Sequence, residues 1–63
     1  MPNNLTSREL SYIEDCLSHE ENLVKKFRNY ADQCQDDTLK RTCEKVADKH
    51  AGHYDTLLHY LKS

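Results

Sequence analysis

The stretch "SRELSYIEDCLSHEENLVKKFRNYADQC", residues 7–34, carries an apolar residue every three or four positions and so predicts one long helix. The stripe consists, in order, of Leu10, Ile13, Leu17, Glu20, Val24, Phe27, Ala31 and Cys34. Alternating steps of three and four place these side chains on one face, by which one helix packs along another. Glu20 is the exception, because a carboxylate on an apolar face must find a partner.

Both ends of this helix carry recognisable signals. Thr6-Ser7-Arg8-Glu9 is a capping box, in which the Thr6 hydroxyl accepts from the Glu9 amide and the Glu9 side chain reaches back. The apolar pattern is interrupted at Gln35-Asp36-Asp37. Either aspartate could cap a second helix, and its negative charge would interact favourably with the positive end of that helix. We therefore predict a first helix over about 7–34 and a tight turn over about 35–37.

A second helix over about 38–62 repeats the same rule. Its stripe consists of Leu39, Cys43, Val46, His50, His53, Leu57 and Tyr60. Neighbouring columns spaced by seven widen both apolar faces, namely Cys16, Leu23 and Tyr30 on the first helix and Ala47, Tyr54 and Leu61 on the second. The fold class is therefore all-α, with residues 1–63 forming a single antiparallel two-helix hairpin.

The width of these faces predicts an oligomer. A chain of 63 residues is near the size at which one domain struggles to bury enough apolar surface to be stable alone. The hairpin has no further element to cover its faces, and a second copy is the simplest cover. We expect a homodimer or larger homo-oligomer, in which two hairpins form a four-helix bundle.

Composition argues against two other classes of partner. The net charge of −2, with both signs interspersed, gives no basic stripe for nucleic acid. No apolar run approaches the length that spans a membrane. The start, Met1-Pro2-Asn3-Asn4-Leu5, lacks the basic and apolar regions of a secretory signal, so we expect a cytoplasmic protein.

The cysteines are expected to be free thiols. Cys16, Cys34 and Cys43 are odd in number and lack the Cys-x-x-Cys spacing of zinc sites. Counting residues from the turn sets Cys34 and Cys43 about 7 Å apart along the helix axis, which is awkward for a disulfide.

Glu20, His50 and His53 are the polar exceptions on the two stripes, and they fall at similar heights. With the centre of the turn near residue 36, Glu20 is sixteen residues away and the histidines fourteen and seventeen. At roughly 1.5 Å per residue, these offsets amount to only about 3 Å and 1.5 Å. We therefore expect the three side chains to form one polar layer.

A divalent metal ion would satisfy this layer. A buried carboxylate and two imidazoles cost free energy unless each finds a partner, and one cation can bind all three. One carboxylate with two histidines recurs in non-haem iron sites and in catalytic zinc sites. We predict Glu20, His50 and His53 as ligands of iron or zinc. The alternative is a hydrogen-bonded layer that only fixes helix register and partner number.

Two segments, "LTSRELSYIEDCLSHEENLVKKF" (5–27) and "LKRTCEKVADKHAGHYDTLLHYL" (39–61), resemble the small spore-coat-F-like proteins of spore-forming Firmicutes over nearly the whole chain. The layout is also similar to ferritin-like bundles, including the two-helix encapsulated ferritins, in which each half brings one Glu and a Glu-x-x-His pair. Glu20 and His53 match that pattern, whereas His50 stands where the second Glu is expected. The resemblance implies a ferritin-like protein related to the spore coat, with spore association and other coat proteins as partners.

The departure at His50 changes the chemistry that the resemblance implies. A dimer would hold two Glu and four His, a set with less negative charge and softer donors, which suits Zn²⁺, Ni²⁺ or Cu²⁺ at least as well as Fe²⁺. His50 in place of the expected Glu makes ferroxidase activity a weaker expectation. No nucleophile or phosphate-binding loop is recognisable in the sequence. We therefore expect a metal-binding protein more than an enzyme. The alternative function is a purely structural coat or adaptor module.

Overall fold

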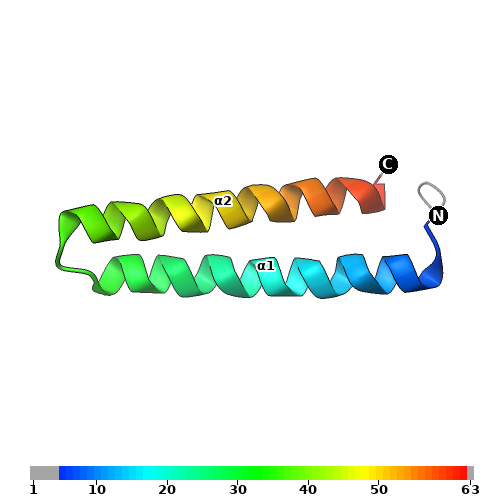
Figure 1. Cartoon of the computed structure of the whole chain (residues 1–63), viewed down its shortest axis with the longest axis horizontal. Coiled ribbons are helices and arrows are strands. Elements are labelled where there is room, and N and C mark those ends of the chain that lie inside the picture. Colours follow the sequence, from blue (N-terminus) through cyan, green and yellow to red (C-terminus); the bar gives the residue numbers. More distant parts are fainter. Residues whose placement is uncertain (1–4, 63) are drawn as a thin grey trace.

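The computed structural model describes residues 5–62, which form two long helices joined by a short connection. Helix α1 spans Ser7–Gln33 and helix α2 spans Asp37–Lys62. The helices lie side by side and antiparallel, so the start of α1 and the end of α2 share one end of the molecule (Figure 1). The predicted helical hairpin is therefore confirmed. Neither helix has the long apolar run needed to cross a membrane.

The capping box fixes the start of α1 as the sequence predicts. The Glu9 amide donates to the Thr6 hydroxyl at 3.0 Å, and the Thr6 amide donates to Glu9 Oε1 at 3.0 Å. These two bonds satisfy amides that would otherwise lack partners at a helix start.

The connection is ordered by Asp36, which settles which of the two aspartates caps α2. Cys34 has extended backbone (φ −75°, ψ 136°), which ends α1. The Leu39 amide donates to Asp36 Oδ1 at 2.7 Å, and the Lys40 amide donates to the Asp36 carbonyl at 2.9 Å. Asp37 lies in the first turn of α2, where its negative charge favours the positive end of the helix.

The interface between the helices is built on small residues. Ala31, Cys43 and Ala47 are its buried apolar members, and Ala47 is fully buried. Alanine lets two helix backbones approach closely. The predicted stripe on α2 is therefore partly wrong: Leu39 and Tyr60 are each 53% exposed, because α2 is rotated towards the column that contains Ala47.

The hairpin is one layer thick and has no deep core of its own. Its Cα atoms extend over 47 × 16 × 10 Å. Within residues 5–62, no large side chain is fully buried, and the leucines along the interface are only partly buried. The broad faces on either side of the helix pair therefore remain uncovered in the single chain.

The cysteines are free thiols, as predicted. Burial, followed by the nearby Cys34 thiol, raises the pKa of the Cys43 thiol.

Candidate metal site

Glu20 is the centre of a polar layer between the two helices. Its side chain points from α1 to α2, and it is the single buried charged residue among those described. The Nδ1 atom of His50 lies 2.7 Å from Glu20 Oε1, and the Nδ1 atom of His53 lies 2.7 Å from Glu20 Oε2. The structure thus brings together the three residues that the sequence singled out, with one histidine on each carboxylate oxygen.

The regular spacing of α2 explains why both imidazoles reach the same carboxylate. Residues three apart lie on the same face of a helix, so His50 and His53 project from consecutive turns. Their ring centroids are 5.4 Å apart and the rings are nearly perpendicular, at 85°. This edge-to-face arrangement aims one nitrogen of each ring at Glu20.

The charge state of Glu20 is set by two opposing effects. Burial alone would raise its pKa, but hydrogen bonds from His50 and His53, together with their charge, outweigh burial and hold the pKa below the usual 4.5. Glu20 is therefore a carboxylate at neutral pH. An anionic oxygen donor flanked by two imidazoles is a set that binds divalent transition metals.

The layer is covered at one side and open at the other. Side-chain exposure rises from 11% at Glu20 to 22% at His50 and 54% at His53. The Phe27 ring stacks on His50 with centroids 6.2 Å apart and planes 17° apart, and Tyr30 packs edge-on against Phe27 at 5.6 Å. The aromatic pair covers His50, whereas His53 opens to solvent.

The three side chains could hold a metal ion. One ligand atom from each of Glu20, His50 and His53 lies within 4.8 Å of the other two. Zinc–nitrogen and zinc–oxygen bonds of about 2.0–2.1 Å would place tetrahedral ligand atoms roughly 3.3 Å apart. The 2.7 Å contacts would have to lengthen by roughly 0.6 Å, and ligand atoms up to 4.8 Å apart would have to move closer together. Three protein ligands would leave a fourth position for water or another ligand.

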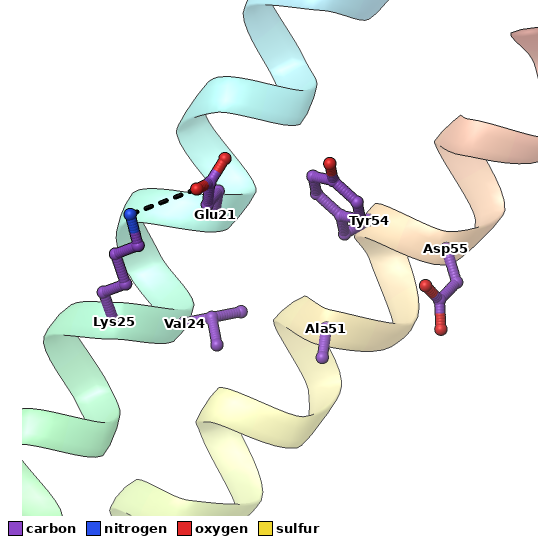
Figure 2. A pocket seen from close by; sticks show the side chains of 6 residues that line it. All are labelled: Glu21, Val24, Lys25, Ala51, Tyr54 and Asp55. Carbon is purple, nitrogen blue, oxygen red and sulfur yellow. Dashed lines mark ion pairs between the residues drawn. The ribbon is translucent and has the colours of Figure 1, made fainter.

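The other histidines and the charged groove lie outside this layer. His19 and His59 are exposed. A groove of about 360 Å³ runs between the helices and is lined by Glu21, Val24, Lys25, Ala51, Tyr54 and Asp55. Figure 2 shows these side chains, with the Lys25–Glu21 ion pair of 3.1 Å running along α1 at one side of the groove. None of the three layer residues lines the groove, so it is a separate feature.

The sequence pattern missed the part that Phe27 takes in the layer. Phe27 is an ordinary member of the α1 stripe, seven residues after Glu20, and its stacking on His50 depends on side-chain orientation. A spacing of seven residues between Glu20 and an aromatic residue on one stripe was the available signal.

Comparison with known proteins identifies one informative relative. The chain is 33% identical over 61 residues to the uncharacterised protein YuzM of Bacillus subtilis (strain 168), an alignment that covers 97% of this chain and 75% of the relative. No protein-family model and no solved structure matches the chain. The geometry of the Glu20 layer is therefore the basis on which a function can be inferred.

Proposed function

This chain belongs to the same family as YuzM of Bacillus subtilis, and we propose that it is a small helical-hairpin protein that binds a divalent metal ion through Glu20, His50 and His53. One observation carries the proposal. Three side chains from two helices converge so that one ligand atom of each lies within 4.8 Å of the others.

The donor set supports zinc or iron as the bound ion. The carboxylate and two neutral imidazoles would leave a divalent ion with a net charge of +1, which a water molecule or an external anion at the fourth position accommodates. Imidazole and carboxylate together suit Zn²⁺ and Fe²⁺, whereas Mg²⁺ and Ca²⁺ prefer all-oxygen sites. A three-residue set with an open position is typical of exchangeable or catalytic sites rather than closed structural ones.

We further propose that two hairpins pair into a four-helix bundle of ferritin-like layout with a role related to the spore coat. The one-layer shape supports pairing, because no large side chain of the described hairpin is fully buried. The resemblance of residues 5–27 and 39–61 to spore-coat-F-like proteins supports the role. His50 in place of a glutamate argues for binding rather than ferroxidase chemistry.

A second candidate function is a structural module whose polar layer only fixes the register of the helices. The observation in its favour is that both oxygens of Glu20 have partners within the chain. The Nδ1 atoms of His50 and His53 each lie 2.7 Å from a different carboxylate oxygen. Among the described residues, every buried side-chain nitrogen and oxygen has a hydrogen-bond partner. Such a layer can be stable without a metal ion.

Isothermal titration calorimetry on protein without an affinity tag distinguishes the two candidates. We expect saturable binding of Zn²⁺, and of Fe²⁺ under anaerobic conditions, with one ion per chain. Glu20→Gln and His53→Ala should weaken binding by more than roughly tenfold. His59→Ala removes an exposed histidine of the same helix and should leave binding unchanged. Absence of saturable binding in the wild type would leave the structural module as the function.

A further inference from the structure

The hairpin has one broad face that is apolar and uncharged along two rows of side chains, here called the open face. On α2 the row advances in steps of seven through Leu39, Val46, His53 and Tyr60. On α1 the facing row consists of Tyr12, Cys16, Leu23 and Tyr30. Ring contacts from Tyr30 to Phe27, from Phe27 to His50 and from His50 to His53 join the two rows across the helix pair.

The largest exposed apolar side chains of the described chain gather on the open face. Tyr12, Tyr30, Leu39 and Tyr60 are each 45–57% exposed. Tyr12 and Tyr60 lie towards one end of the hairpin, and Tyr30 and Leu39 lie towards the turn. Exposed aromatic side chains along one face are typical of a protein interface rather than of a solvated surface.

The opposite face is unsuited to the same role because charges cross it. Lys25 pairs with Glu21 at 3.1 Å, and Arg28 pairs with Asp48 at 3.5 Å from one helix to the other. Lys25, Glu21 and Asp55 also line the groove on that side (Figure 2). Covering this face would remove several exposed charges from water without offering them new partners.

The surface area indicates how much cover the chain needs. Its accessible surface is 4882 Å². A compact folded chain of 7.4 kDa is expected to expose roughly 4,200 Å². The excess of about 700 Å² is close to the roughly 800 Å² that each partner buries in a standard interface. One interface on one face would therefore give this chain the exposure of an ordinary folded protein.

We infer that a second copy of this chain packs on the open face and closes the proposed metal site over His53. His53 belongs to the open-face row and is the one ligand that is mainly exposed, at 54%. A second copy is the occupant because an apolar face without charges is self-complementary in a two-fold dimer, in which each hairpin covers the other. The metal part of this inference rests on the proposed function, whereas the choice of face does not.

Closing the site makes metal binding and dimerisation reinforce each other. In the single chain bulk water reaches the proposed metal site at His53, and a second copy on the open face would restrict that access. Linkage then requires that zinc tighten the dimer by the same factor by which dimerisation tightens zinc binding. The protein would bind metal more strongly at high concentration than at low concentration.

Sedimentation equilibrium of the untagged full chain, in chelator and with Zn²⁺, tests the inference. Tyr12→Lys and Tyr30→Lys place a charge on the open face and should each raise the dimer dissociation constant by at least about tenfold. Ser11→Lys and Asn29→Lys add the same charge one residue away, at exposed positions that point away from α2, and should leave it unchanged. Circular dichroism checks that all four variants are helical.

The possible results separate the two proposals. Zinc should tighten the wild-type dimer and have no effect on the dimer of Glu20→Gln. A protein that binds zinc but stays monomeric would overturn the inference and leave the metal-binding function standing. A dimer that Tyr12→Lys and Tyr30→Lys leave intact would also overturn it. A dimer broken by these variants but indifferent to zinc would support the open face and refute the coupling to metal.

Discussion

Zinc should raise the melting temperature of this protein strongly, and His53→Ala should abolish the effect. At a free concentration one hundred times its dissociation constant, a ligand that binds only the folded state stabilises it by about 2.7 kcal/mol. For 63 residues the entropy of unfolding is about 0.13 kcal/mol/K, so this stabilisation corresponds to an increase of roughly 20 °C. The small size of the chain makes the shift large.

The same substitution should change little when no metal is present. The His53 side chain is 54% exposed, so its contact with Glu20 is well solvated and contributes little by itself. Thermal melts followed by circular dichroism give the melting temperatures of the wild type and of His53→Ala, each in chelator and with zinc. Equal zinc shifts in the wild type and His53→Ala would refute the site, and so would a large loss of stability of His53→Ala in chelator.

Three further predictions concern other features of the structure. The pKa of Glu20 is lowered in the folded chain, so its stabilising effect is present above pH 4.5 and is lost as the pH falls through the folded pKa. Acid titration of metal-free protein should therefore destabilise the wild type more steeply than Glu20→Gln below pH 4.5, and parallel curves would contradict this. Ala47→Leu should cost about 1–3 kcal/mol in urea unfolding, because Ala47 is fully buried where the helices meet. Ala51→Leu, which extends into the groove, is its control and should stay within about 0.5 kcal/mol of the wild type. Gly52→Ala should stabilise the chain by about 0.5–1 kcal/mol, because a Cβ there meets no atom within 4 Å; a loss of stability would show that Gly52 has another role.

The features that depend on helix periodicity could be predicted from the sequence. A helix rises by a fixed amount per residue, so counting from the turn brought Glu20 to the height of His50 and His53. The capping box of Thr6 and Glu9 was equally predictable, because its two hydrogen bonds depend on local spacing alone.

The features that depend on side-chain size and on irregular backbone could not be predicted in this way. The apolar stripe on α2 is too wide to fix its rotation, which is set by the small Ala47 at the interface. The extended backbone at Cys34, which ends α1 at Gln33, one residue before the predicted end, is likewise not set by periodicity. The opening of the layer at His53 indicates the face on which a partner would pack. It follows from the exposure of each ligand, which only the structure gives.

X-ray absorption spectroscopy at the zinc edge shows whether the Glu20 layer binds the metal ion, because it identifies the ligand atoms. Three free cysteines compete with the Glu20 layer for a soft metal ion, so stoichiometry alone does not identify the site. We expect imidazole nitrogens and carboxylate oxygen at about 2.0–2.1 Å, with no sulfur. A sulfur shell at about 2.3 Å, or a spectrum without imidazole scattering, would contradict it.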